Sequence, residues 1–329
     1  VNLNLYSKRK NFNLSKIKKT YLLKKKIKIN YFFKEKPKRS LFRSIYFGFW
    51  CIKNLQKNSL VLSRSIIPAI MLILMNYKVI LEIHHEMSGL TKVIFNFFSK
   101  LNFLHKMRFI FIHRNLQKIF DKNKDKSIIL DDCVEIEDFK NKYKVKKRCV
   151  YTGSFTKGKG IEVIFKIAKK IPYIQFDAYG NIDTIENLDT KSLKNLNFKN
   201  YISYNKIPRV LKSNLILLMP YQKKIGILAK NLDVSKYISP LKLFEYLAAS
   251  NIIVASKLPV YSHILKNNFN CIMCDPDNID DWCKSIKNIF KNPKKFEKIK
   301  KNSFKTAKNY TWKIRSNKIL KFAANQNLI

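Results

Sequence analysis

The fold of this chain depends on the stretch Tyr237-Ile-Ser-Pro-Leu-Lys-Leu-Phe-Glu-Tyr-Leu-Ala-Ala-Ser-Asn-Ile-Ile-Val-Ala255. Ser239 is a good N-cap, because its hydroxyl can accept a hydrogen bond from a backbone N–H of the first helical turn. Pro240 suits the first helical position, where a missing N–H costs nothing. The stretch therefore predicts a helix that begins at these two residues.

The same stretch predicts the helix's buried face and the strand that follows it. Leu241, Phe244 and Ala248 repeat at helical spacing, which indicates a buried face. Residues 250–251 are small and polar and end the helix. The apolar residues 252–255 are typical of a buried parallel strand.

Lys242 and Glu245 lie three residues apart on another face of this helix. A helix that opens on free N–H groups, with a lysine in its first turn, favours an anion. The carboxylate one turn further on could hold a diol beside that anion, as in the ribose and diphosphate of a nucleotide. An ordinary amphipathic helix with a solvated Lys–Glu pair would have the same pattern.

The run from Ser239 to Ala248, followed by a polar turn and an apolar strand, resembles the donor-nucleotide motif of the GT-B glycosyltransferases. It is most similar to the family-four retaining group. That resemblance implies that Glu245 holds the ribose hydroxyls. The family has another glutamate earlier in the motif, and Tyr237 stands at that position here.

The composition is globular but strongly basic. Hydrophobic residues make up 46% of the 329 residues, and 66 Lys and Arg against 22 Asp and Glu give a formal charge of +44. A charge of this size could reflect nucleic-acid binding, attraction to an anionic membrane, or coding bias toward Lys, Asn, Ile and Phe. The lysines are spread over the whole chain, which favours coding bias and argues against nucleic acid as a partner.

Six cysteines at irregular spacing do not form a disulfide framework in a chain of this length. Cys271 and Cys274 form a lone CxxC near Cys283, too few ligands at suitable spacing for a zinc site. We expect no metal and no cofactor. A reducing cytoplasm is the default location, with the inner face of the membrane as an option. The apolar run 66–75 is too short to span a bilayer.

The first half of the chain contains a β-α-β pattern. Residues 59–62 and 78–83 are expected strands around a helix at 66–75, and His84 and His85 follow the second strand. Ligands of open α/β sheets bind at the carboxyl ends of strands. A histidine pair at such a position is a candidate for function, although a lone histidine is more often structural.

Family members resembling this chain carry a histidine after a strand of the first domain, and either His84 or His85 could match it. We take His84 as a catalytic residue. Arg64, His85 and His113 follow strands at the same predicted sheet edge and are assigned to the acceptor side. A helix at 41–55 has an aromatic face (Phe42, Tyr46, Phe49 and Trp50) that is expected to be core. The acidic run 131–138 is interpreted as a solvated cluster, with a role in ordering acceptor hydroxyls as the alternative.

The second half opens with a strand at 149–152, a basic loop with three glycines at 153–160, and a helix from Ile161. This order is expected of a phosphate site, although the loop is neither a P-loop nor GxGxxG. In the family, a Lys-Gly at this helix start holds the donor diphosphate, and Lys159-Gly160 matches it. Ser154 replaces the basic residue that usually follows the first glycine, and Lys157 is a candidate to compensate.

Further strands are expected at 173–179, 200–204 and 215–219. The first ends at Gly180 and Asn181 and the last at Pro220 and Tyr221, which by resemblance lie near the nucleotide. The donor-binding candidates are Gly153, Ser154, Lys157, Gly160, Gly180, Asn181, Pro220, Tyr221, Ser239, Pro240, Leu241 and Lys242. Lys159 and Glu245 join His84 as catalytic candidates.

Together these patterns predict an α/β protein of GT-B type, with two Rossmann-like domains facing each other across a cleft. The first domain is expected at 1–145, the nucleotide-sugar domain at 146–305, and a helix crossing back to the first domain at 306–329. The glycine-rich first loop of the family's amino-terminal domain is missing. Either that loop has diverged or the chain, which starts at Val1, is truncated there.

The predicted function is transfer of a sugar from a nucleotide-sugar donor to the hydroxyl of a glycan or glycolipid acceptor. By resemblance the transfer is retaining and metal-independent, and it belongs to surface glycan or lipopolysaccharide assembly. Peripheral contact with an anionic membrane is an additional expectation. The alternatives are a non-catalytic basic protein that binds nucleic acid or membrane, and a GT-B domain that binds nucleotide without transfer.

Overall fold

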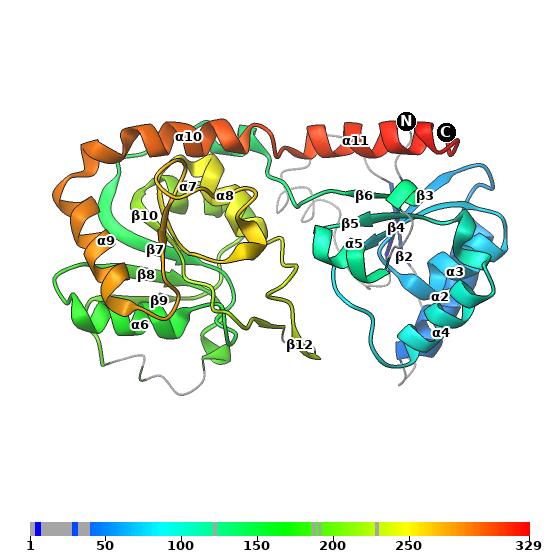
Figure 1. Cartoon of the computed structure of the whole chain (residues 1–329), viewed down its shortest axis with the longest axis horizontal. Coiled ribbons are helices and arrows are strands. Elements are labelled where there is room, and N and C mark those ends of the chain that lie inside the picture. Colours follow the sequence, from blue (N-terminus) through cyan, green and yellow to red (C-terminus); the bar gives the residue numbers. More distant parts are fainter. Residues whose placement is uncertain are drawn as a thin grey trace. The chain divides into compact units, whose positions relative to one another are not determined.

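A computed structural model describes residues 4–7, 28–31, 40–120, 124–185, 189, 192–227 and 230–329. The chain divides into two compact units, Val1–Asp131 with Asn317–Ile329, and Asp132–Ser316. We call them unit 1 and unit 2. Both are α/β, and each is built on a parallel sheet (Figure 1).

The sheet of unit 1 has the order β3-β4-β5-β6, and all its neighbours are parallel. Its strands are β3 (Leu60–Ser63), β4 (Lys78–Ile83), β5 (Arg108–Phe111) and β6 (Ser127–Ile129). The strands follow one another in sequence order, so each connection crosses over the same way. The ends that follow β3, β4 and β5 therefore meet at one edge of the sheet.

Helices connect these strands. They are α2 (Ser40–Asn54), α3 (Ile66–Leu74), α4 (Gly89–Lys100), α5 (Arg114–Phe120) and the short η1 (Phe103–Lys106) and η2 (Lys124–Lys126). Helix α3 is apolar nearly all round and packs against α2, α4 and β4. The parallel pair β1 (Asn4–Ser7) and β2 (Lys28–Tyr31) also belongs to this unit, and residues 8–27 between them lie outside the described residues.

The end of the chain completes the core of unit 1. Ala323 and Leu328 pack with Ile80, Ile110 and Leu130 from the sheet. Ala323 lies in α11 (Trp312–Asn325), whose residues from Asn317 onward belong to this unit.

The sheet of unit 2 has six parallel strands in the order β14-β13-β10-β7-β8-β9. They are β7 (Lys146–Thr152), β8 (Phe176–Tyr179), β9 (Leu196–Lys199), β10 (Asn214–Met219), β13 (Ile252–Ser256) and β14 (Ile272–Cys274). The central position of β7 places its carboxyl end between those of β10 and β8, where such sheets bind ligands.

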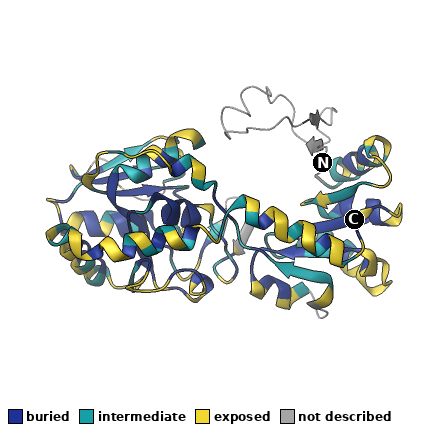
Figure 2. Ribbon diagram, turned by 90° about the horizontal axis from the view of Figure 1, so that it is seen from above, coloured by how far each residue is buried: buried dark blue, intermediate teal, exposed yellow. Residues whose placement is uncertain are grey.

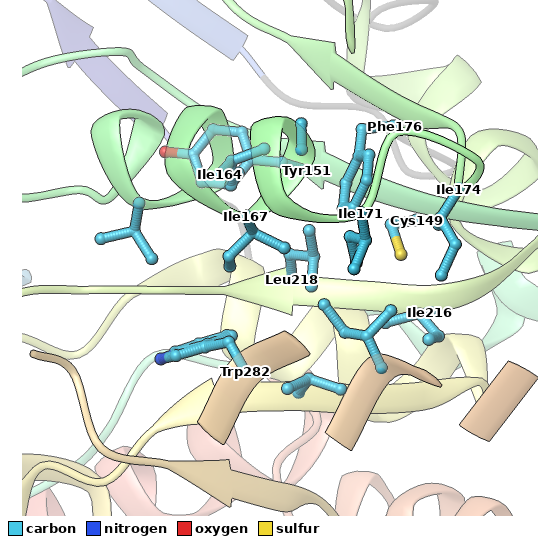
Figure 3. Packing of buried hydrophobic residues seen from close by; sticks show 14 of the residues in the cluster. Cys149, Tyr151, Ile164, Ile167, Ile171, Ile174, Phe176, Ile216, Leu218 and Trp282 are labelled. Atoms are coloured by element: carbon cyan, nitrogen blue, oxygen red, sulfur yellow. The ribbon is translucent and has the colours of Figure 1, made fainter. Parts of the chain in front are cut away.

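Helices cover both faces of this sheet, with exposed residues on their outer sides (Figure 2). Helices α6 (Ile161–Lys170) and α9 (Ile279–Lys291) pack together on one face. Helix α8 (Leu241–Ala249) packs against α7 (Ile207–Lys212) and α10 (Glu297–Ala307), and α7 also contacts β10. Figure 3 shows Ile164 and Ile167 of α6, and Ile171 just after it, in one cluster with strand residues and with Trp282 of α9. The remaining elements are short: η3 (Ile136–Phe139), η4 (Ile182–Thr184), η5 (Tyr204–Lys206), η6 (Pro259–Tyr261), η7 (Pro293–Phe296), and the antiparallel pair β11 (Gly226–Ile227) and β12 (Lys230–Asp233).

Two expectations about elements were wrong. The strand expected at 200–204 is a loop leading into η5, and the edge strand β9 comes just before it. The aromatic face of α2 is not core, because Phe42, Tyr46 and Phe49 are exposed while Phe47 is buried. A run of apolar residues identifies a helix with a hydrophobic stripe, but it does not say what covers that stripe.

Candidate functional site

The candidate donor site lies in unit 2, at the carboxyl ends of β7, β8 and β10 and at the start of α8. Because these three strands are adjacent and parallel, Gly153, Gly180 and Pro220 all follow strand ends at one edge of the sheet. Helix α8 precedes the parallel strand β13, so its amino end lies at that same edge. The structure thus gathers the predicted donor-binding positions on one side of unit 2.

The loop after β7 is tightly constrained around its glycines. Gly160 has φ +91°, and a Cβ there would lie 1.9 Å from the carbonyl oxygen of Pro220. The carbonyl of Gly158 accepts a hydrogen bond of 2.9 Å from the N–H of Gln222. The loop after β7 and the loop after β10 are therefore held together by backbone contacts that leave no room for side chains.

Lys159, on this loop, is largely buried beside Ser154. Its ammonium donates a hydrogen bond of 2.8 Å to the Ser154 hydroxyl, and burial lowers the pKa of Lys159. Ser154 therefore contacts the lysine that the family resemblance assigns to the diphosphate. Lys157 is exposed, and Asn181 uses its side chain to cap η4 by accepting from the N–H of Asp183.

Helix α8 begins differently from the prediction. Pro240 is the N-cap and Leu241 the first helical residue. Ser239 was expected to cap the helix, but its hydroxyl accepts a hydrogen bond of 2.9 Å from the backbone N–H of Asp132. Ser239 thereby ties the helix start to the first residue of unit 2 and leaves the first-turn N–H groups without this side-chain cap.

Lys242 is buried rather than solvated. Its Nζ lies 3.6 Å from the centroid of the Tyr151 ring and 5.1 Å from that of Tyr221. Within the described part of the chain, the ammonium has no hydrogen-bond partner. Burial, and next the charge of Lys159, hold the pKa of Lys242 well below its ordinary value.

Glu245 lies one turn further along α8 and is also buried. Burial raises its pKa to about 7, against the opposing effect of Lys242. The interpretation of the two side chains as a solvated pair is therefore wrong. The buried Lys242 and Glu245, with the half-buried Lys159, can bind an anion together with a hydroxyl-bearing group.

Gly153 makes room for this arrangement. Its φ is +144°, and a Cβ there would lie 2.6 Å from the Lys242 Nζ. Gly180 is equally restricted, since its Cβ would lie 2.3 Å from the carbonyl oxygen of Gly153. Steric contacts therefore explain why both Gly153 and Gly180 are glycine.

Sequence reasoning missed two tyrosines of the site, Tyr151 and Tyr246. Tyr151 supplies the ring beneath Lys242 and donates from its hydroxyl to the Ser154 carbonyl at 2.8 Å. The Tyr246 hydroxyl accepts from the N–H of Thr152 at 3.0 Å, linking α8 to the end of β7. Only their positions in the sequence could have indicated them. Tyr151 lies at the end of a strand, two residues before Gly153, and Tyr246 follows Glu245.

The catalytic and acceptor-side candidates of the first half lie in unit 1. Arg64 follows β3, His84 and His85 follow β4, and His113 follows β5, so they share one edge of that sheet. The His84 Nε2 lies 2.5 Å from Glu82 Oε1, and His85 Nδ1 lies 2.8 Å from the Glu86 carbonyl oxygen. The His113 Nδ1 accepts from the N–H of Asn115, whereas Arg64 is exposed.

The cysteine group is buried and unbridged. Cys271, Cys274 and Cys283 are free thiols, and burial raises the pKa of both Cys271 and Cys274 to about 12. No cluster of three or more His, Cys, Asp or Glu side chains that could hold a metal occurs among the described residues. Over the same residues, no helix has both the length and the apolar character needed to cross a membrane.

Comparison with solved structures shows where this fold occurs. A glycosyltransferase from Rickettsia africae superimposes with a TM-score of 0.68 at 14% identity, over 90% of this chain and 85% of that one. Anabaena Alr3699/HepE, solved with UDP and glucose, gives 0.70 at 9% identity, over 98% and 99%. The sucrose-phosphate synthase of Thermosynechococcus elongatus gives 0.64 at 12% identity, over 88% and 80%. These likenesses establish the GT-B fold.

Comparison with curated protein sequences gives no match. The family model described as glycosyl transferases group 1, however, matches residues 134–306, which is more than half of the chain and nearly all of unit 2. The chain therefore belongs to the group 1 glycosyltransferase family and is a glycosyltransferase.

Proposed function

We propose that this protein transfers a sugar from a nucleoside-diphosphate sugar, bound by unit 2, to a hydroxyl of a glycan or glycolipid. The observation that carries the proposal is Lys242, a buried ammonium without a hydrogen-bond partner among the described residues, beside the buried Glu245. Burying an unpaired cation is costly, and a diphosphate would relieve that cost. The Anabaena protein of the same fold, solved in complex with UDP and glucose, supports this ligand class.

In the proposed reaction, the acceptor oxygen forms a bond to C1 of the sugar, and its proton passes to an oxygen of the departing diphosphate. The bond from C1 to the diphosphate breaks, and its electron pair remains on the departing nucleoside diphosphate. Lys159, Lys242 and the uncapped first turn of α8 would stabilise the negative charge that develops there. This set of positive groups makes a metal ion unnecessary, so we propose metal-independent transfer.

Glu245 would accept hydrogen bonds from the ribose hydroxyls. Gly153, Gly160, Gly180, Pro220 and Leu241 would supply the backbone that the nucleotide contacts. His84 is proposed to act near the donor sugar, and Arg64, His85 and His113 on the acceptor. Retention of the anomeric configuration, and a place in surface glycan or lipopolysaccharide assembly on the cytoplasmic side, are proposed from the family resemblance.

A donor screen tests the proposal. The purified chain is incubated with UDP-, GDP- and ADP-linked sugars, with and without EDTA, and free nucleoside diphosphate is measured. We expect one base to be preferred and release to persist in EDTA. Release that EDTA abolishes would reject the metal-independent mechanism. Absence of release and of binding for every donor would reject the donor site itself.

A further inference from the structure

Helix α4 of unit 1 has an apolar row on its exposed side. It buries Phe95, while Leu90, Val93 and Phe97 recur at spacings of three and four residues along the helix, and Leu101 continues the row. With Phe103 of η1, these residues are between 46% and 62% exposed. We call the five residues Leu90, Val93, Phe97, Leu101 and Phe103 the α4 stripe.

A stripe of this kind is unusual on a surface that faces only water. Single exposed apolar residues are common, but a continuous row of large ones usually marks a contact surface. Helix α4 is apolar on both sides, because Phe95 is buried and Ile94 and Phe98 are half-buried on the inner side while the stripe lies on the exposed side. Packing among the described residues of unit 1 therefore does not explain why these positions are apolar.

The charged residues within α4 and within the helices packed against it are all basic. Helices α2, α3, α4 and η1 contain no Asp or Glu, whereas Lys92 and Lys100 in α4 and Lys106 in η1 are exposed. Lysines beside an apolar row can place their ammonium groups at phosphates while their stems lie along the apolar surface. Basic residues with Leu and Phe on one helix are typical of helices that lie in the interface of an anionic membrane.

Helix α2 carries a second row of exposed apolar residues. Helix α3 packs against both α2 and α4 (Figure 1). On α2, Phe42, Tyr46 and Phe49 are exposed at helical spacing. Exposed apolar residues thus occur on all three helices of the α2–α3–α4 layer, with Leu74 on α3, and these helices contain basic residues and no acidic ones.

We propose that the α4 stripe inserts into the headgroup–acyl boundary of an anionic phospholipid bilayer, with Lys92 and Lys100 on the lipid phosphates. A second copy of the chain is a poor occupant, because two molecules of formal charge +44 repel each other. A bilayer of anionic lipid satisfies both requirements, since it takes up apolar side chains and attracts the surrounding lysines. This surface is independent of the donor site in unit 2.

Vesicle flotation of the full chain tests the proposal. Vesicles of phosphatidylcholine alone are compared with vesicles in which one lipid in three is phosphatidylglycerol. The variant Val93→Glu/Phe97→Glu places carboxylates in the stripe and should lower the bound fraction on anionic vesicles about tenfold or more. The control Tyr173→Glu changes an exposed aromatic residue of unit 2 and should bind like the wild type. Circular dichroism and a wild-type midpoint of thermal unfolding of the full chain show that each variant is folded.

Three results would overturn the proposal. The first is that the wild-type chain does not float with anionic vesicles, which would mean that another segment or protein covers the stripe. Alternatively, Val93→Glu/Phe97→Glu would float as well as the wild type, and binding would be a property of charge alone. Finally, a wild-type dimer that the double variant converts to a monomer, without vesicle binding, would assign the stripe to self-association.

Discussion

Lys242 shows most clearly how the candidate donor site differs from an ordinary helix surface. It is held by the faces of Tyr151 and Tyr221 and not by a hydrogen-bonding carboxylate. Cation–π contacts offset part of the cost of burial, but they leave all three N–H groups of the ammonium free to donate. A phosphate oxygen is a suitable acceptor for them.

We predict that a nucleoside diphosphate binds with proton uptake. Burial lowers the pKa of both Lys159 and Lys242, and a bound diphosphate would raise both because it favours the charged form. Calorimetry in buffers of different ionisation enthalpy measures this uptake. Lys242→Gln should reduce it, and equal uptake by the variant and the wild type would remove Lys242 from the explanation.

Lys159→Ala should lower the rate of transfer by about 10²-fold or more if the lysine meets charge that develops on the leaving group. The measurement is the rate of nucleoside-diphosphate release with the preferred donor. Lys166→Ala, an exposed lysine in α6, serves as the matched control and should keep the wild-type rate. A wild-type rate in Lys159→Ala would exclude that assignment.

The raised pKa of Glu245 makes stability depend on pH in a defined direction. Between its ordinary value of 4.5 and its folded value of about 7, the folded chain keeps a proton that the unfolded chain releases. The free energy of unfolding should therefore fall as pH rises across this interval.

Glu245→Gln removes this ionisation. The free energy of unfolding of the variant, relative to that of the wild type, should therefore rise by about 1–3 kcal/mol from pH 4.5 to pH 8. Urea unfolding at the two pH values measures the difference. Glu297→Gln, at an exposed pair with Lys300, should show almost no change. A Glu245→Gln difference that is the same at both pH values would contradict the raised pKa.

At the scale of elements, the turn between β7 and α6 decides whether the site can form. Gly153→Ala should weaken nucleotide binding about tenfold or more, because the new Cβ would displace the Lys242 ammonium and the backbone is in a region unfavourable to alanine. Affinity for the preferred nucleoside diphosphate measures this. Gly226→Ala is the control, since its Cβ would meet nothing closer than 3.7 Å. Equal affinity in both variants would mean that Lys242 can be displaced without loss.

Elements with a strong local signal were predictable from the sequence. Strand β4 and the start of α6 lie where apolar periodicity and flanking polar residues placed them. Ser250 ends α8 in a left-handed conformation, φ +57°, as the polar pair after Ala249 indicated. The two parallel sheets and the α/β class follow from the same repeated pattern.

What the sequence could not show depends on contacts between distant residues. The partner of Ser239 is Asp132, 107 positions earlier in the chain, so a local capping rule gave the wrong partner. The burial of Lys242 in α8 depends on the ring of Tyr151, which comes from strand β7. The exposure of Phe42 and Phe49 reflects which side of α2 meets α3, and an apolar stripe is the same in sequence whichever surface covers it.

At the scale of the whole molecule, the two units carry different parts of the proposal. Unit 2 contains the matched family region with Lys159, Lys242 and Glu245. Nucleotide binding by the full chain tests this unit. Unit 1 contains His84, Arg64 and the α4 stripe, which we propose act on the donor sugar, the acceptor and the membrane, respectively. The formal charge of +44 belongs to both and is the main source of confusion in any binding assay.

The most direct test of the donor site is therefore a thermal-shift measurement with UDP, GDP, ADP and a polyanion, at low and moderate salt. The structure predicts stabilisation by one nucleoside diphosphate that survives moderate salt, because Lys242 and Glu245 are buried and little screened. Glu245→Ala should abolish that shift. Stabilisation by the polyanion alone, disappearing as salt is added, would contradict a donor site in unit 2 and leave charge as the basis of binding.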